Sequence, residues 1–481
     1  MPENTAFIST AIPYVNARPH IGHALEYVQT DAMARYLRLT GLDCYSLTGS
    51  DENSLKNVRA AEDEGISTQE LCDRNTQIFV ELLSSLNLAT SDFIRTSSQQ
   101  HFDGAKELWS RCKPDDIYKK HYSGLYCVGC EDFYNEKDFP DKKCPDHNTE
   151  LELVEEENYF FKLSNYEDKL LELIESNELR IVPATKRNEI LSFIRGGLLD
   201  FSISRSRKRA GNWGIPVPGD DNQVMYVWYD ALANYLTALN LEEGSEKLSK
   251  YWLDCPKRIH MIGKGINRFH TVYWPAMLMS ADLPIPSEVF VHGYLTINGQ
   301  KISKSLGNVV DPMEQVETFG TDAVRYYLLR AISPTEDGDY SETRFREVYN
   351  ADLANNLGNL ARRVETIGAK AGHTPFAETD QEAPEGYHEA MADYRFNDAL
   401  ATLWRAATDL NQRIEEVKPW VLAKESRDDE LAVFLDEMIV GLRKIGTWLV
   451  PFLPETGDRL ADMFRSGTPI GQSDPLFPRL K

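Results

Sequence analysis

The sequence predicts an α/β protein in which a parallel sheet precedes a long helical region. Phe7–Ile12 alternates like a strand, a helical pattern follows it, and Cys44–Gly49 is again strand-like, as at the start of an α/β unit. After Asp339, helical patterns with polar connections continue to the end and predict a helical bundle. The stretch between Tyr122 and Leu163 differs from the sheet region and from the helical region, because it consists of short strands, turns and cysteines.

The first helix is predicted to begin at His20, directly after the turn Pro13–Pro19. Apolar residues recur at helical spacing, Asp31 and Arg35 form an i,i+4 pair, and Gly41 is placed to end the helix.

The motif His20-Ile21-Gly22-His23 therefore opens a helix after a strand. Backbone N–H groups and the positive end of the helix dipole gather there and can hold phosphate, and the imidazoles add donors. Gly22 has no side chain, so a flat base can lie on the backbone. Two surface histidines are the alternative, but an H-x-G-H pattern is expected by chance only roughly 0.01 times in a chain of this composition.

Length and composition indicate a soluble protein of about three domains. The 481 residues are 42% apolar and 26% charged, and no apolar run has the length of a membrane span. The start MPENTAFIST lacks the features of a targeting segment, so a cytoplasmic location is expected. Seven cysteines are too few for a disulfide framework.

The net charge of −23, taken alone, disfavours a polyanion partner. RNA affinity depends instead on where basic residues collect, and Arg205–Arg209 is one candidate patch. A solvated loop is an equally good interpretation, and the acidity could reflect a salty habitat.

The ligand site of an open parallel sheet lies at the carboxyl ends of its strands, so Ala11–Tyr14 and Gly49–Glu52 should face one crevice. Asp63–Leu88 is helical in pattern. No G-x-G-x-x-G and no P-loop motif is present, which excludes the common dinucleotide and P-loop nucleotide sites.

Four potential metal ligands follow the pattern C-x2-C-x13-C-x2-H: Cys127, Cys130, Cys144 and His147. Tetrahedral zinc takes four N or S ligands brought by two tight knuckles, which this spacing supplies. A thioredoxin-like redox pair would leave Cys144 and His147 unexplained. Because all four positions are filled by protein, the ion should be structural.

Val224–Tyr229 is strand-like and Asp230–Leu239 is helical in pattern. Trp228, Tyr235 and His270 stand out in and after this stretch, although for most such aromatic residues a place in the core is the better interpretation.

The alternation of Val289–Ile297 followed by Asn298-Gly299 predicts a hairpin. The hairpin delivers Lys301-Ile302-Ser303-Lys304-Ser305 onto a loop, where two lysines and two hydroxyl groups can clasp a triphosphate. Alone, this sequence could be any solvated basic turn.

The two motifs together resemble the two signatures, HIGH and KISKS, of the class I aminoacyl-tRNA synthetases. The closer resemblance, over essentially the whole chain, is to the methionyl-tRNA synthetases. Its residues are Ala11–Tyr14, His20–His23, Thr48–Glu52, the four metal ligands, Trp213–Pro216, Tyr226–Ala231, Gly263–Lys264, Trp274–Leu278, His292–Tyr294 and Lys301–Ser305. Asn53-Ser54 and Gly265 depart from the family pattern, which usually has His-Gly and Asp there.

The resemblance implies a Rossmann-like catalytic domain in two halves, 1–115 and 224–295, separated by a zinc-bearing connective insertion, 116–223. It further implies a KISKS loop and stem-contact region, 296–345, and an α-helical anticodon-binding domain, 346–481. The chain stops after the bundle, without the dimerising C-terminal domain that some family members carry, so a monomer is expected.

The resemblance also implies roles for single residues. The catalytic residues would be His20, His23, Lys301 and Lys304. ATP would be bound by these four residues together with Gly22, Ser303 and Ser305. The methionine pocket would comprise Ala11, Ile12, Tyr14, Asp51 for the ammonium group, Trp228, Tyr235, Ile266 and His270. The tRNA anticodon would be read by Asn355, Asn359 and Trp420, although Trp420 could instead be a core indole.

The implied reaction joins methionine to initiator and elongator methionine tRNAs through methionyl-adenylate, with Mg²⁺ accompanying ATP and one structural Zn²⁺ per chain. Three alternatives carry less weight. A small-molecule nucleotidyl transferase needs no helical bundle, and an isoleucine, valine or leucine enzyme would need an editing insertion for which there is no room. A non-catalytic RNA-binding relative would not be expected to keep both motifs.

Overall fold

The computed structural model describes residues 4–127, 132–134, 141–144, 149–302, 307–376 and 382–480, with the backbone alone given for 132–134. It divides into two compact units. The sheet unit comprises Met1–Pro19, Gly41–Glu81 and Ala89–Val291; the helical unit comprises His20–Thr40, Leu82–Leu88 and His292–Lys481.

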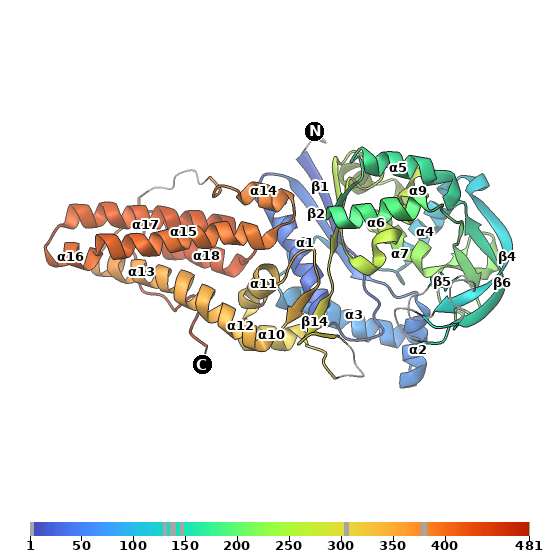
Figure 1. Ribbon diagram of the computed structural model, residues 1–481, viewed down its shortest axis with the longest axis horizontal. Helices are drawn as coiled ribbons and strands as arrows, with labels where there is room; N and C mark the ends of the chain where they lie inside the picture. The colour runs from blue at the N-terminus through green and yellow to red at the C-terminus, as the bar shows by residue number, and fades with distance from the viewer. Residues whose placement is uncertain are drawn as a thin grey trace. The chain divides into compact units, whose positions relative to one another are not determined.

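A six-stranded sheet with the order β3-β2-β1-β12-β13-β7 forms the centre of the sheet unit (Figure 1). The pairs β1–β2, β1–β12, β2–β3 and β7–β13 are all parallel, which confirms the α/β expectation. The strands are β1 (Thr5–Thr10), β2 (Asp43–Ser50), β3 (Asp92–Arg95), β7 (Arg180–Val182), β12 (Lys257–Gly263) and β13 (Glu288–His292).

Two helix boundaries differ from the prediction. The helical pattern from 63 to 88 is two helices, because Gly65 in the left-handed region, at φ 70°, ends α2 before α3 begins. α7 begins at Val227, so the β-forming residues Val227 to Tyr229 are its first turn and the strand prediction was wrong there. The α-helices are α2 (Leu55–Glu64), α3 (Thr68–Ser85), α4 (Gln99–Arg111), α5 (Glu167–Glu175), α6 (Ala184–Arg195), α7 (Val227–Thr237), α8 (Glu246–Leu248) and α9 (Trp274–Ser280).

Shorter helical segments complete the sheet unit. Ser249–Leu253 and Phe269–Tyr273 are π-helical, whereas Pro114–Asp116, Leu163–Tyr166, Leu241–Glu243 and Lys264–Ile266 are 3₁₀ turns.

The stretch set apart by its cysteines contains a long antiparallel hairpin. β4 (Ile117–Cys127) pairs with β6 (Glu152–Phe161) over ten residue pairs from Ile117–Phe161 to Tyr126–Glu152. β5 (Asp132–Tyr134) and β8 (Phe201–Ser202) complete this sheet, and β9 (Ser204–Ser206), β10 (Pro216–Val217) and β11 (Asp220–Met225) form a second one.

The helical unit begins with α1 (Ile21–Leu39), which confirms the predicted start of a helix at the HIGH motif; His20 is its N-cap. The predicted turn is also confirmed: Asn298 and Gly299, at φ 49° and 75°, join β14 (Leu295–Ile297) to β15 (Gln300–Lys301). Val289–Ile297 is not one strand, however, since β13 ends at His292 and β14 pairs with β16 (Gly338–Tyr340) instead.

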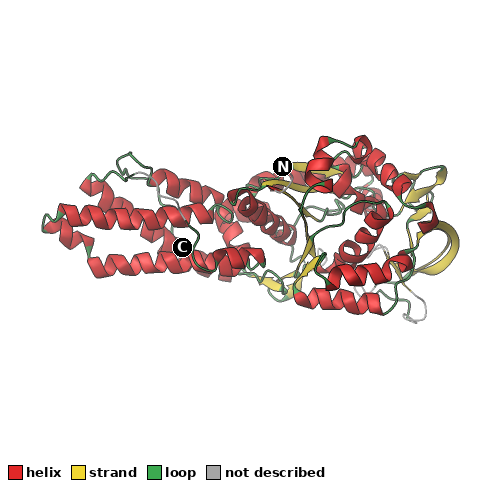
Figure 2. Ribbon diagram, turned by 90° about the horizontal axis from the view of Figure 1, so that it is seen from above, coloured by secondary structure: helices red, strands yellow, loops and turns green. Residues whose placement is uncertain are grey.

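The remainder of this unit is nearly all helix (Figure 2), as the sequence predicts. α15 and α17 are its longest helices and pack along one another. The helices are α10 (Pro312–Phe319), α11 (Thr321–Arg330), α12 (Glu342–Val348), the π-helix η9 (Tyr349–Gly358), α13 (Asn359–Ala371), α14 (Tyr387–Ala392), α15 (Phe396–Val417), α16 (Pro419–Lys424), α17 (Asp428–Leu449) and α18 (Pro454–Met463).

Residues 464–480, here called the C-terminal tail, are not helical and run back along η9 and α13. Ser473 donates from its N–H and its Oγ to the buried carboxylate of Glu365, at 2.6 Å each. Tyr349 Oη donates to the Pro478 carbonyl at 2.9 Å, and the side chain of Asn350 pairs with the backbone of Leu480. The chain therefore continues well past its last helix, which the sequence did not predict.

One fully buried side chain connects distant parts of the helical unit. The Arg325 guanidinium, on α11, donates to the carbonyls of Leu86, Pro451 and Phe452 at 2.7–3.1 Å. It also pairs with Asp31 of α1 at 2.7 Å. Asp31 forms the predicted i,i+4 pair with Arg35, likewise at 2.7 Å.

No helix among the residues that the structure describes is long and apolar enough to cross a membrane.

Candidate active site and substrate-binding residues

The two histidines of the HIGH motif are oriented by backbone hydrogen bonds at the start of α1. The His20 N–H donates to His23 Nδ1 at 3.0 Å, and the Gly22 N–H donates to His20 Nδ1 at 3.1 Å. Because Nδ1 accepts in both rings, the proton of each neutral imidazole sits on Nε2. The rings stack with centroids 4.0 Å apart.

Burial keeps both imidazoles neutral. Desolvation lowers the pKa of His20 to about 4 and that of His23 well below its ordinary value. Gly22 is required sterically, since a Cβ there would lie 2.9 Å from His20 Cε1. The start of α1 is therefore a rigid pair of neutral N–H donors, a chemistry suited to phosphate oxygens.

The KISKS segment flanks this helix start within the same unit. A Cβ on Gly22 would lie 3.7 Å from Ile302 Cδ1, and the Ile21 N–H donates to the Val310 carbonyl at 3.0 Å. Lys301 is exposed at the end of β15. Ser303, Lys304 and Ser305 lie outside the described residues.

In the sheet unit, the residues predicted to bind methionine begin where β1 ends. Ala11 donates from its N–H to the Met261 carbonyl at 3.2 Å. The Asp51 N–H donates to the Pro13 carbonyl at 2.8 Å, and Tyr14 forms an isolated parallel bridge with Asp51. The carboxyl ends of β1 and β2 therefore meet as predicted. Gly49 permits this, because a Cβ there would lie 2.2 Å from the Ile94 carbonyl oxygen and 3.1 Å from Ile12 Cγ2.

Tyr235 and His270 form a buried polar pair. His270 Nδ1 lies 3.0 Å from the Ile266 carbonyl and must donate to it, so Nε2 accepts from Tyr235 Oη at 2.7 Å. Burial lowers the pKa of His270 to about 4. Trp228 stacks on Phe269, with ring centroids 3.9 Å apart, and Trp228 and Tyr14 both pack against the cluster of Tyr126, Val154, Tyr226 and Val227.

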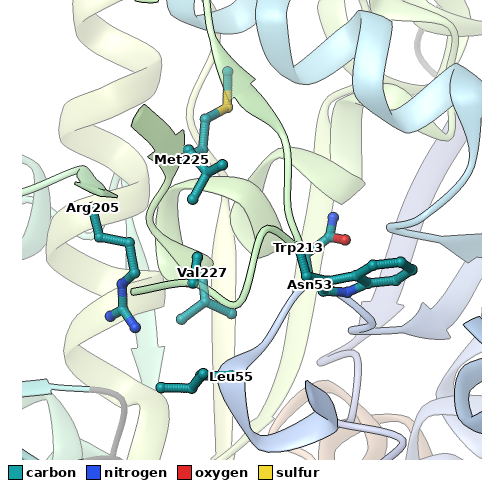
Figure 3. Close-up of a pocket in the computed structure, with 8 residues that line it drawn as sticks. Asn53, Leu55, Arg205, Trp213, Met225 and Val227 are labelled. Carbon is teal, nitrogen blue, oxygen red and sulfur yellow. The ribbon is translucent and has the colours of Figure 1, made fainter. Parts of the chain in front are cut away.

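Asn53, one of the departures from the family pattern, has a defined place that sequence reasoning missed. Its amide donates to the Thr96 carbonyl at 2.9 Å and to Asp230 Oδ2 at 2.8 Å. Asp230 Oδ1 meets His101 Nε2 at 2.7 Å. Figure 3 shows Asn53 beside Trp213 in a small pocket lined also by Arg205 and Val227. The network was not predictable because its members lie up to 177 residues apart.

Glu52 is a second missed residue, and it is entirely buried. Arg95 makes a bidentate pair with it, at 2.8 and 3.0 Å, and Thr76, Ser50 and Ser97 donate to the same carboxylate. Five donors hold this side chain, so it fixes the loop after β2 and has no lone pair directed at a ligand.

Two of the four predicted zinc ligands fall within the described residues. Cys127 and Cys144 are each 1% exposed and pack in one cluster with Leu125 and Leu151. The Cys144 N–H donates to the Thr149 carbonyl at 2.9 Å. Cys130 and His147 lie outside the described residues, and within those residues no three His, Cys, Asp or Glu side chains gather as a metal site.

The candidate basic patch at 205–209 is not a continuous surface. Arg205 is buried, donates to Tyr126 Oη at 2.7 Å and lies over the rings of Tyr126 and Tyr226. Arg209 pairs with Glu152, which leaves Arg207 and Lys208 as the exposed cations of this run.

The three residues predicted to read an anticodon are all exposed on the helical unit. Asn355 lies in η9, and Asn359 is the first residue of α13. Trp420 on α16 is 47% exposed, so the alternative that this indole belongs to the core was wrong. The Arg363 guanidinium lies 6.0 Å from the Trp420 ring and pairs with Glu415 at 2.6 Å. Sequence reasoning missed Arg363, although it follows Asn359 by four helical residues.

Known proteins resemble this chain along nearly its whole length. The family model described as tRNA synthetases class I (M) matches residues 6–153 and 137–365. The chain belongs to the class I methionyl-tRNA synthetase family. A methionine–tRNA ligase of Brucella suis is 42% identical over 98% of this chain and 97% of its own length, and one of Thermotoga maritima is 41% identical over 94% and 74%.

Solved structures agree with this membership. Methionyl-tRNA synthetase of Mycobacterium tuberculosis in complex with methionyl-adenylate is 38% identical, with a TM-score of 0.90 over 99% of this chain and 100% of that one. The free form of the enzyme from the same organism has a TM-score of 0.84 at 36% identity, over 100% of this chain and 99% of that one.

The neutral state of His270 predicts a pH dependence of stability. In the unfolded chain this histidine titrates near 6.5, but in the folded protein only near 4, so the unfolded state binds more protons between those values. The free energy of unfolding should therefore fall as the pH is lowered through this window. The contribution of His270 is at most about 1.4 kcal/mol per pH unit.

Urea unfolding at several pH values between 7 and 5 would test this in wild type and in His270→Gln. The variant should lose less stability on acidification. His121→Gln, which removes an exposed histidine from β4, is the matched control. Equal pH dependence in wild type and His270→Gln would contradict the assignment.

Proposed function

We propose that this protein is an ATP-dependent methionine–tRNA ligase that charges tRNA through a methionyl-adenylate. The observation that carries the proposal is 42% identity over 98% of the chain to a methionine–tRNA ligase, joined to a TM-score of 0.90 with a methionyl-adenylate complex. The geometry of the HIGH motif supplies an independent chemical argument.

In the first step, a methionine carboxylate oxygen attacks the α-phosphorus of ATP, a new P–O bond forms, and the bond to pyrophosphate breaks. Charge develops on the phosphate oxygens. The Nε2–H groups of His20 and His23 are the proposed neutral donors, with Lys301 and Lys304 as cations and Gly22, Ser303 and Ser305 completing the ATP site. Mg²⁺ bound with ATP would neutralise phosphate charge.

Methionine needs an apolar pocket with one carboxylate for its ammonium group. We assign the carboxylate to Asp51, which is 2% exposed at the end of β2. The pocket wall is assigned to Ala11, Ile12, Tyr14, Trp228, Tyr235, Ile266 and His270. His270 holds the Tyr235 hydroxyl, and thereby orients a polar atom in a largely apolar wall.

In the second step, the terminal ribose hydroxyl of the tRNA attacks the adenylate carbonyl and AMP leaves. Unpaired bases are read by stacking and by hydrogen bonds to their edges. The exposed indole of Trp420 and the exposed amides of Asn355 and Asn359 have this chemistry, and Arg363 beside the indole adds a cation. Both initiator and elongator methionine tRNAs are proposed substrates.

Amino-acid-dependent ATP–pyrophosphate exchange tests the proposed function directly. Among the twenty amino acids, methionine should support by far the fastest exchange, and the protein should charge methionine onto unfractionated tRNA. Exchange that depends on a different amino acid would overturn the substrate assignment.

A structural zinc ion is proposed for Cys127, Cys130, Cys144 and His147. Two thiols buried together in one small cluster are a donor set that fits zinc. The ion would fix the turn between β4 and β6 and would take no part in the reaction.

Purified protein should therefore contain about one zinc per chain, and Cys144→Ser should lose most of it, because three ligands hold the ion less tightly than four. Metal analysis of the two proteins checks this. Cys255→Ser, which changes a buried cysteine of the sheet unit, is the matched control and should keep its zinc. Undiminished zinc in Cys144→Ser would refute the ligand set.

Trp420→Ala should lower kcat/KM for tRNA charging by roughly 10- to 100-fold, because one stacked base is lost. Methionine-dependent exchange and the melting temperature should stay near wild type, since the indole is exposed. Val433→Ala, which removes another exposed apolar side chain from the helical unit, should change none of the three. Unimpaired charging by Trp420→Ala would remove this residue from the anticodon site.

We further propose a cytoplasmic monomer. Its parts would be a catalytic domain, 1–115 and 224–295, a connective insertion, 116–223, a stem-contact region with the KISKS loop, 296–345, and an anticodon-binding domain, 346–481.

A further inference from the structure

The helix that carries Asn355 is not an ordinary α-helix. Tyr349–Gly358 is π-helical, and α13 continues from it at Asn359. The Asn359 N–H reaches back five residues to the Ala354 carbonyl. A π segment costs backbone hydrogen-bond geometry, so it persists where side chains hold it, and such segments often occur at functional sites.

An amide pair holds this segment from α15. The Asn411 amide donates to Asn356 Oδ1 at 2.9 Å and to the Ala407 carbonyl at 3.1 Å. The Asn356 amide donates to Thr408 Oγ1 at 3.2 Å, and Thr408 in turn donates to the Trp404 carbonyl at 2.8 Å. Asn356 is thereby fixed through both atoms of its side-chain amide, while its neighbour Asn355 is exposed.

A second set of contacts fixes both ends of the same helix. The C-terminal tail binds Tyr349 and Asn350 at the start of the π segment and Glu365 beyond its end. At Gly358 a Cβ would lie 2.9 Å from the Leu353 carbonyl oxygen and 3.7 Å from Phe477 of the tail. The segment is therefore held in its wide turn along its whole length.

The wide turn changes which residues share a face. A π turn takes roughly 4.4 residues, so the four-residue step from Asn355 to Asn359 rotates the side chain by about −30°. The α-helical step from Asn359 to Arg363 rotates it by about +40°. The two offsets nearly cancel and bring Asn355 and Arg363 into one narrow stripe, whereas a continuous α-helix would separate them by about 80°.

We propose that Asn356 and Asn411 are positioning residues for base recognition, which maintain the π turn and so align Asn355, Asn359 and Arg363 for one anticodon. This inference rests on the proposed function. Arg363 is itself fixed between the Trp420 ring and Glu415, so the register of Asn355 relative to Arg363 depends on the turn.

The test compares Asn411→Ala and Asn356→Ala with Gln412→Ala, which removes an exposed amide one residue further along α15. Each of the first two should raise KM for tRNA about five- to tenfold, the effect of losing one well-placed hydrogen bond. The kcat and KM of methionine-dependent ATP–pyrophosphate exchange should not change, and Gln412→Ala should behave as wild type.

A double-mutant cycle with Asn355→Ala separates positioning from simple loss of stability. If Asn411 acts through Asn355, Asn411→Ala should raise KM for tRNA less than twofold in the Asn355→Ala background. An equal effect in both backgrounds, or impaired exchange, would overturn the proposal. An unchanged KM for tRNA in Asn355→Ala alone would instead refute the anticodon role on which the proposal rests.

Discussion

The helical unit depends on one buried charge, the Arg325 guanidinium. It joins α1, the segment 82–88 and the turn after α17, and each of its partners lies more than a hundred residues from Arg325 in the sequence. A desolvated cation is tolerated only when it is well paired, and here three carbonyls and the Asp31 carboxylate accept from the guanidinium. Removing the guanidinium would take this donor from the three carbonyls and leave Asp31 paired with Arg35 alone, at a cost of about 3–5 kcal/mol. The start of α1, where the two histidines lie, therefore has a fixed position relative to α11.

The HIGH motif uses hydrogen bonding more than charge. Two imidazolium ions with centroids 4.0 Å apart would repel each other, and burial already removes their protons at neutral pH. The backbone then selects the tautomer with a donor at Nε2. Neutral donors in a fixed geometry can stabilise a transition state without holding pyrophosphate too tightly after it forms; in the proposed function, the lysines of the KISKS segment would supply the positive charge.

Local signals explain what the sequence could predict. The start of α1 at the HIGH motif, its Asp31–Arg35 pair and the Asn-Gly turn before Lys301 depend on neighbouring residues, and each was confirmed. Val227 to Tyr229 were misassigned because β-branched and aromatic residues favour strands until tertiary packing decides otherwise. Asn53 joins residues distant in sequence, and η9 depends on an amide 55 residues away, so neither leaves a periodic signal.

The C-terminal tail imposes an order on the folding of the nascent chain. Tyr349 emerges from the ribosome 129 residues ahead of its partner Pro478, an interval of roughly ten seconds at ordinary rates of synthesis. During that time η9 and α13 can form and pack on α15, and the Glu365 carboxylate can pair with Arg362 but lacks its two hydrogen bonds from Ser473. The contacts of the tail with Tyr349, Asn350 and Glu365 are therefore the last that this helix acquires.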